Sequence, residues 1–308
     1  MERQIKNGLK LISPSSSSFL PSSLIPVNAI NKHNSDLAER MISGDESGDF
    51  LTPPVKWAGG KRWLAERIEK LWYRHMNRRY VEPFCGGMAV ALYINPERAL
   101  LNDANVHLIN LYRQIKKGLT LTLDMRNDRA LYYEYRKRFN GLVGSSGQDT
   151  AEAAELFYYL NRTCFNGLCR FNNSGMFNVP FGRYKTINYR SDFLEYSSAF
   201  SRWDFSSVDF EELKITSGDF VYADPPYDVE FTHYSKVDFS WSDQERLAKW
   251  LSDLDCPVVL SNQSTERIEE LYRGYGFEIS FVDAPRYISS DGNRSMATEI
   301  IATLRIAR

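Results

Sequence analysis

The sequence has few cysteines and histidines, and their spacing disfavours a zinc site. The four cysteines stand at irregular intervals with no CxxC pair: Cys85, Cys164, Cys169 and Cys256. The four histidines form no HxxxH or CxxH arrangement. Zinc sites depend on such ligand spacings. We therefore expect no metal, and reduced thiols of the kind found in cytosolic proteins.

Long hydrophobic runs and a surplus of positive charge are also missing. No apolar stretch reaches the roughly 20 residues that span a bilayer, and Pro14, Pro21 and Pro26 interrupt any signal-peptide core. We expect a soluble, intracellular protein. The formal net charge is −1, so a surface for a polyanion would have to be local.

The hydrophobic content is sufficient for a large core, but the first 50 residues differ in composition from the rest of the chain. The chain has 308 residues, of which 43% are hydrophobic, enough for one large domain or two. Residues 1–50 include the low-complexity stretch SPSSSSFLPSS (13–23). We expect these 50 residues to form a flexible extension and order to begin near Leu51.

Beyond Leu51 the patterns of strand and helix alternate. Helical spacing follows residues 64–72, 88–94, 106–111, the stretch after Ser242 and the stretch up to Tyr272, and Ser242 with Glu245 has the spacing of a capping box. The expected strands are residues 80–85, 97–103, 218–224, 256–262, 277–283 and 298–306. Such alternation predicts an open, mostly parallel α/β sheet with ligands at the carboxyl ends of its strands.

Residues 113–215 break this alternation and are expected to be helical and loop-like. Within them, NRTCFNGLCRFNNSGMFNVPFGRYKTINYR (161–190) holds five Lys or Arg, six aromatic residues and no Asp or Glu. Cations interleaved with aromatics and Asn suit a surface that contacts phosphates and base edges. A loop-rich subdomain with the aromatics as its core explains the composition equally well.

The stretch YVEPFCGG (80–87) indicates a nucleotide-type site. A strand that opens through glycines into a helix lets the backbone approach a ligand and offers free N–H groups. The GxGxxG fingerprint is absent. Asp103 follows Gly86 by 17 residues, about where a ribose acceptor is expected, and Glu82 ends the first strand. Alternatively, both acids are loop caps.

The stretch VKWAGGK (55–61) resembles part of a phosphate loop without being one. It does not match GxxxxGK[ST], and Arg62 follows the lysine, which disfavours nucleotide hydrolysis. Trp57 and Lys61 are then either site residues or a core tryptophan and a surface lysine.

The tetrapeptide Asp224-Pro225-Pro226-Tyr227 is the strongest signal. Two prolines end a strand, because they lack backbone donors. The carboxylate and a proline carbonyl can accept the hydrogens of an exocyclic amine, which makes its nitrogen more nucleophilic, and the tyrosine offers a stacking face. The alternative is a proline-rich turn with a solvated acid.

In their order along the chain, KWAGGK, EPFCGG, LLNDANVHLINLY, NRTCFNGLCRFN…FNVPFGRYK and DPPY resemble the Dam-type (D12 class) adenine-N6 DNA methyltransferases. The resemblance spans about residues 53–305. It implies a Rossmann-like S-adenosylmethionine-dependent methyltransferase fold, an α/β sheet formed by residues 51–112 and 216–308. Residues 113–215 would be the target-recognition domain.

The resemblance also implies roles for individual residues. S-adenosyl-L-methionine would be the methyl donor, and no metal is implied. The catalytic residues would be Asp224, Pro225, Pro226 and Tyr227, which would hold the N6 amine of an adenine flipped out of the duplex. The cofactor-binding residues would be Trp57, Lys61, Glu82, Phe84, Gly86, Asp103 and Asp224. This chain has Met88 where many relatives have glycine.

The same resemblance predicts double-stranded DNA as partner and GATC as target. Arg170 would bond a guanine edge, Leu168 and Pro180 would contact a thymine methyl, and Lys56 would contact the first guanine. Phe165 would wedge into the base stack, and Asn166 would fill the gap that the adenine leaves. The full expected DNA-binding set is Lys56, Phe165, Asn166, Leu168, Arg170, Pro180 and Tyr184. We expect a monomer in the cytoplasm of a bacterial or phage-infected cell.

Two other functions remain open from the sequence. Cytosine-N4 methyltransferases typically carry Ser where Asp224 stands, and methyltransferases of protein or RNA amines carry Asn, so Asp224 favours adenine. A DNA-binding relative that has lost catalysis is a different class, and the intact Lys61, Asp103 and DPPY weigh against it.

Overall fold

The computed structural model describes residues 51–228, 239–284 and 297–306. The predicted flexible extension, residues 1–50, lies outside the described residues. The four cysteines are free thiols. Within the described ranges, no helix is both long and apolar enough to cross a membrane.

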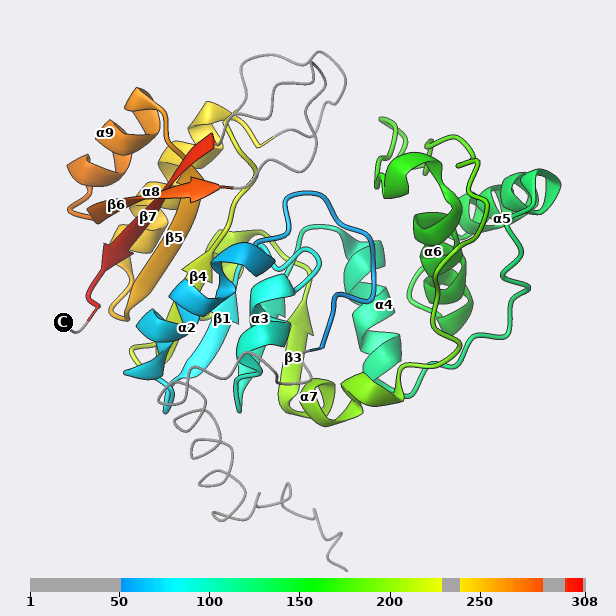
Figure 1. Cartoon of the computed structure of the whole chain (residues 1–308), viewed down its shortest axis with the longest axis horizontal. Coiled ribbons are helices and arrows are strands. Elements are labelled where there is room, and N and C mark those ends of the chain that lie inside the picture. Colours follow the sequence, from blue (N-terminus) through cyan, green and yellow to red (C-terminus); the bar gives the residue numbers. More distant parts are fainter. Residues whose placement is uncertain (1–50, 229–238, 285–296, 307–308) are drawn as a thin grey trace, which may run out of the picture. The chain divides into compact units, whose positions relative to one another are not determined.

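A seven-stranded sheet forms the centre, with the strand order β3-β2-β1-β4-β5-β7-β6 (Figure 1). The strands β3, β2, β1, β4 and β5 are parallel, and β7 runs antiparallel between β5 and β6. Their bounds are β1 Arg79–Glu82, β2 Ala99–Asn102, β3 Trp203–Ser206, β4 Asp219–Ala223, β5 Val258–Gln263, β6 Glu278–Ala284 and β7 Ala297–Leu304. The sheet confirms the expected mostly parallel α/β class.

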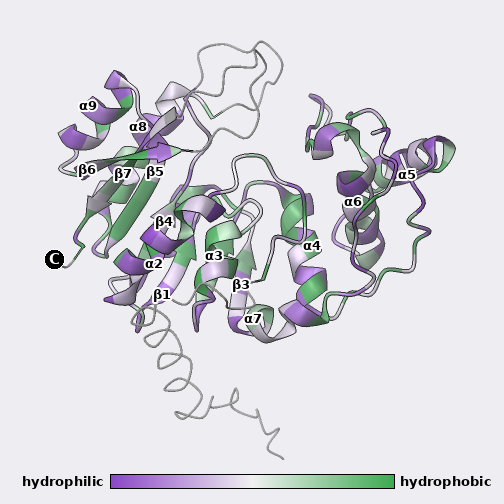
Figure 2. Cartoon of the chain, viewed as in Figure 1, coloured by the Kyte–Doolittle hydropathy of each residue, from purple (hydrophilic) through white to green (hydrophobic). Residues whose placement is uncertain are grey.

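Helices cover both faces of this sheet because neighbouring strand residues point to opposite sides. Tyr80 and Phe220 belong to a core shared with α2 (Ala65–Tyr73), α3 (Ala89–Ile94) and α4 (Val106–Lys116). Val81 and Val221 belong to a second core, shared with α8 (Trp241–Asp253) and α9 (Glu266–Gly274). In Figure 2, hydrophobic colours run along β5, and hydrophilic ones lie on α2 and α9.

The segment 113–215 is largely helical and loop-like, as expected. The helices α5 (Arg129–Leu142) and α6 (Ala151–Thr163) pack against each other, and α6 packs against α4 (Figure 1). Short 3-10 turns occupy Phe165–Gly167 and Leu194–Tyr196, and α7 (Ser197–Arg202) leads into β3. The sequence patterns did not predict β3, whose four residues form an edge strand paired only with β2. This segment therefore also contributes to the central sheet.

The predicted capping box was wrong by two residues. The N-cap of α8 is Ser240, whose side chain accepts from the backbone N–H of Asp243, while the Asp243 carboxylate accepts from the N–H of Ser240. Ser240 has the extended backbone that an N-cap requires. Ser242 therefore lies inside the first turn, and Glu245 does not close the box.

Met88 has a left-handed backbone (φ 59°, ψ 30°) and is fully buried immediately before α3. A glycine adopts this conformation without steric cost, whereas another residue is strained there. This chain therefore accommodates a non-glycine residue in a left-handed conformation here, and the Met88 side chain fills core volume.

Candidate active site

A cavity of about 1400 Å³ opens at the carboxyl ends of β1, β2 and β4. Its walls come from four sequence-distant segments: the loop Trp57–Lys61, the turn Glu82–Gly87, the residues Asn102–Ala104, and Asp224–Asp228. Val208–Phe210 and Phe239–Trp241 also contribute to the lining. Every residue predicted to be catalytic or to bind the cofactor lines this one cavity. Parallel strands end at a shared sheet edge, which explains the convergence.

The glycine turn after β1 carries the Trp57 side chain. Gly86 has φ +44°, and a Cβ added to it would lie 2.7 Å from the Trp57 Nε1 atom. A side chain at this position would therefore collide with the indole. The Gly86 carbonyl accepts a hydrogen bond from the Tyr112 hydroxyl at 2.6 Å, which ties the turn to α4. The turn thus holds a flat aromatic at the cavity wall.

Asp224 and Lys61 form a partly buried ion pair in the wall. The Lys61 Nζ atom lies 3.1 Å from Asp224 Oδ1, and the Ser261 hydroxyl donates to the same oxygen at 2.8 Å. Burial raises the pKa of Asp224 to about 6, although Lys61 and Ser261 act in the opposite direction. Near neutral pH the group is therefore an acceptor of hydrogen bonds, which is the state that an amine requires.

The sequence reasoning missed three residues that support this loop: Glu299, Ser261 and Gln244. Glu299 on β7 accepts a hydrogen bond from the Tyr227 hydroxyl. A single charged residue, the glutamate in the run TEIIATL (298–304), was the available signal. Ser261 on β5 also contacts the Tyr222 hydroxyl at 2.9 Å. Nothing in its local sequence distinguishes it from a core serine.

The two proline carbonyls have different surroundings. The Gln244 side chain donates to the Pro226 carbonyl at 2.9 Å, and Asn262 donates to the Gln244 oxygen at 3.2 Å. Among the described residues, no donor reaches the carbonyl of Pro225. Asp224 and Pro225 therefore present the acceptors that a ligand amine could use.

On the β1 and β2 side, two carboxylates face the cavity. Asp103 accepts from the N–H groups of Gly86 (3.0 Å) and Asn105 (2.9 Å), one on each oxygen, and burial raises its pKa. Glu82 accepts from the Tyr80 hydroxyl at 2.9 Å, and burial raises the pKa of Glu82 to about 8. Acceptor capacity remains on both oxygens of Asp103 for a diol. The ring of Phe84 packs against Phe239 and Phe210 beside them.

This arrangement fits a nucleoside cofactor that carries an amino-acid group, such as S-adenosylmethionine. Asp103 suits ribose hydroxyls, and Phe84 supplies an apolar wall for a base. Glu82 is a buried acid that a cationic amino group would ionise. The cavity also has ample volume for such a molecule.

The residues predicted to bind DNA gather in a second region. Phe165 and Leu168 are 50% and 41% exposed, and Asn166 between them has a left-handed backbone (φ 53°). The Phe165 N–H donates to the Pro180 carbonyl at 2.8 Å. The exposed Arg170 donates through Nε to Asn178, so its outer nitrogens point to no described acceptor. Large apolar side chains exposed beside a cation are typical of an interaction surface.

Lys56 joins this region to the cavity loop. Asn161, at the end of α6, bonds both the N–H and the carbonyl of Lys56, each at 2.8 Å. The Lys56 Nζ atom lies 4.0 Å from the centre of the Tyr184 ring. The Tyr184 hydroxyl donates to the Cys164 carbonyl at 2.9 Å. Lys56 and Lys61 belong to one loop. This loop therefore links the predicted DNA-binding residues to the predicted cofactor-binding residues.

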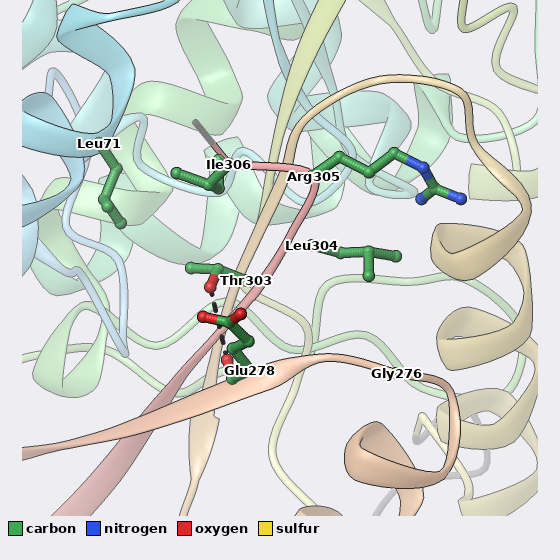
Figure 3. Close-up of a pocket in the computed structure, with 7 residues that line it drawn as sticks. All are labelled: Leu71, Gly276, Glu278, Thr303, Leu304, Arg305 and Ile306. Atoms are coloured by element: carbon green, nitrogen blue, oxygen red, sulfur yellow. Dashed lines mark hydrogen bonds between the residues drawn. The ribbon is translucent and has the colours of Figure 1, made fainter. Parts of the chain in front are cut away.

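A smaller hollow of about 300 Å³ lies at the other end of the sheet (Figure 3), where β7 ends beside the start of β5. Leu71, Leu304 and Ile306 supply its apolar lining, and the Arg305 side chain extends away from Glu278. None of the predicted site residues lies there. The large cavity is therefore the candidate active site.

Comparison with known proteins gives one family. A family model described as D12 class N6 adenine-specific DNA methyltransferase matches residues 57–288. A type II methyltransferase from Lactococcus lactis is 36% identical and matches 82% of this chain and 95% of its own length. A DNA adenine methylase from Vibrio cholerae is 35% identical over 80% and 94% of the two chains. A DNA N-6-adenine-methyltransferase from Escherichia phage P1 is 34% identical over 89% of this chain, which spans 38% of that relative's length.

Proposed function

The chain belongs to the D12 class of N6 adenine-specific DNA methyltransferases, and from this premise we propose that it methylates the adenine of GATC in double-stranded DNA. The observation that carries the proposed chemistry is the Lys61–Asp224 pair beside Tyr227 at the rim of a cavity suited to a cofactor. The family implies S-adenosylmethionine as methyl donor.

Asp224 and Pro225 hold the target amine in this proposal. The Asp224 carboxylate and the Pro225 carbonyl each accept one N6 hydrogen, so the nitrogen gains nucleophilicity as positive charge develops on it. Pro226 suits this part less well, because its carbonyl already accepts a hydrogen bond from Gln244. The prolines restrict the loop, and Tyr227 offers its ring to the flipped base.

Lys61 keeps Asp224 in its accepting state. Without the cation, burial would favour the protonated carboxyl, which has less acceptor capacity. When bound, S-adenosylmethionine supplies a methyl group on a positively charged sulfur. We assign Asp103 to its ribose, Glu82 to its amino group, and Trp57, Phe84 and Gly86 to the walls around it.

Target choice is assigned to the exposed turn after α6. Arg170 reads a guanine through its free outer nitrogens, and Leu168 and Pro180 contact a thymine methyl. Phe165 enters the base stack, and Asn166 occupies the space that the flipped adenine leaves. Lys56, held over the Tyr184 ring, contacts the first guanine.

One experiment tests this specificity. Unmethylated plasmid is incubated with the enzyme and S-adenosylmethionine, then challenged with nucleases that cut only unmethylated or only methylated GATC. We expect protection from the first nuclease and cleavage by the second. If GATC stays unmodified while N6-methyladenine appears elsewhere in the plasmid, the family chemistry stands and the proposed target is wrong.

A further inference from the structure

Glu299 is a buried acid at the active site for which methyl transfer has so far needed no role. It lies on β7, where it pairs with Gln263 and Val282 of the neighbouring strands, and it is 6% exposed. Its Oε1 atom accepts the Tyr227 hydroxyl, 72 residues away in sequence. Its Oε2 atom has no hydrogen-bond partner among the described residues, and lies 4.0 Å from the Lys61 Nζ atom.

Two acids therefore share one lysine. The Lys61 Nζ atom lies closer to Asp224 (3.1 Å) than to Glu299 (4.0 Å), and it stands 4.6 Å from the centre of the Tyr227 ring. Buried charges are costly unless they are paired. One cation between two carboxylates divides its stabilisation between them, and the charge on Glu299 also repels the charge on Asp224.

We propose that Glu299 is a positioning residue for methyl transfer, which anchors the Tyr227 ring by its hydroxyl and shares Lys61 with Asp224. The proposal rests on the role assigned above to Asp224 and Tyr227. A ring held at its hydroxyl by Glu299 and on its face by Lys61 has little freedom to rotate. A base that stacks on this ring then meets it already oriented, which lowers the entropic cost of alignment.

Neutralising Glu299 should have a specific electrostatic result. The charged and titratable groups around Asp224 are Lys61, Glu299, Glu82, Tyr80, Tyr222 and Tyr227. Of these, Glu299 raises the pKa of Asp224 and Lys61 lowers it. In Glu299→Gln the lysine serves Asp224 alone, so the pKa of Asp224 should fall below its value of about 6.

The test measures kcat/KM against pH for total N6-methyladenine formed on unmethylated DNA of mixed sequence, so that it does not depend on the target sequence. Glu299→Gln keeps an oxygen for the Tyr227 hydroxyl and loses the charge. We expect the acidic limb of the profile to move to lower pH. Glu299→Ala loses both the acceptor for the Tyr227 hydroxyl and the negative charge, and kcat should fall about tenfold or more.

A double-variant cycle tests the anchoring separately. Tyr227→Phe breaks the same hydrogen bond from the other side. The fall in activity that Tyr227→Phe causes in the wild type should therefore be largely absent when it is added to Glu299→Ala. Thermal melting checks that each variant is folded. If Glu299→Ala does not fold, Glu299→Gln still tests the charge.

Glu155→Gln provides a matched control. Glu155 is equally buried (7% exposed), but its carboxylate accepts from Thr122 and Leu123 instead of active-site groups. Its replacement should leave the acidic limb in place. An unmoved limb in Glu299→Gln, or additive losses in the double variant, would overturn the role of Glu299. A wild-type enzyme that forms no N6-methyladenine at any pH would instead overturn the function on which that role rests.

Discussion

At the scale of single residues, the proposed role of Asp224 depends on its ionisation, because the carboxylate is the state that accepts hydrogen bonds from an amine. Its pKa is raised from 3.8 to about 6, so the carboxyl is protonated below that pH and loses acceptor capacity. We expect kcat/KM to fall as pH drops through about 6.

Asp224→Ala should lose at least about two orders of magnitude in rate while DNA binding persists. Methylation within a few-fold of the wild type would exclude the assigned role.

Gly167 controls the position of Lys56. The glycine has φ +64°, and an added Cβ would lie 2.5 Å from Lys56 Cδ and 2.7 Å from Lys56 Cβ. Gly167→Ala should therefore displace the lysine and weaken duplex binding, which fluorescence anisotropy measures. Gly175→Ala is the control, because Gly175 has a similar φ (+72°) but its nearest contact would be an ordinary 3.6 Å. Equal losses in both variants would show that backbone strain alone is responsible.

The residues that could be predicted are those that lie in local motifs. Asp224, Lys61 and Asp103 each follow a strand or glycine turn, and their positions at a common cavity follow from strand direction. Glu299 could not be placed in the same way. It lies on an antiparallel strand, and its contact with Tyr227 depends on the β5–β7 register, which the sequence pattern does not reveal.

At the scale of elements, the start of α8 fixes the position of Gln244, which lies in the first turn of this helix and donates to the Pro226 carbonyl in the cavity wall. Ser240 is the N-cap, and Ser242 only contacts its hydroxyl at 2.8 Å. Ser240→Ala should lower the free energy of unfolding by about 0.5–2 kcal/mol, as measured by urea denaturation. Ser242→Ala should cost clearly less. A larger loss of stability in Ser242→Ala than in Ser240→Ala would support the capping box predicted at Ser242 and Glu245.

The strands and helices that could be predicted have strong periodic patterns, and the one missed strand does not. The strands β4 and β5 are continuous buried runs bounded by turns, so their type is evident. The strand β3 has four residues, with buried Trp203 and Phe205 alternating with more exposed ones. So short an alternation also fits a loop. Its pairing with β2 is a tertiary effect.

At the scale of the whole molecule, binding to a polyanion must come from local charge. The 38 Lys and Arg are balanced by 39 Asp and Glu, whereas residues 161–190 hold five cations and no acid. Arg162 donates to the Pro54 carbonyl, and Arg190 pairs with Glu195. Arg183 and Lys185 are exposed and pair with no described residue. These two are therefore available for phosphates.

Lys185→Ala should weaken binding to every duplex by the same factor and reduce the slope of log Kobs against log salt by about 0.9. Arg170→Ala should instead relax the choice at guanine, at a cost of about 1–3 kcal/mol in discrimination. Lys249→Ala is the control, since this exposed lysine pairs with Asp253 on α8. Anisotropy titrations over a range of salt concentrations separate the cases. If Lys185 and Lys249 change the slope equally, the cations of residues 161–190 have no special part in binding DNA. A salt slope that depends on Lys185 and not on Lys249 would place the phosphate backbone against this segment, where Phe165 and Arg170 can reach the bases.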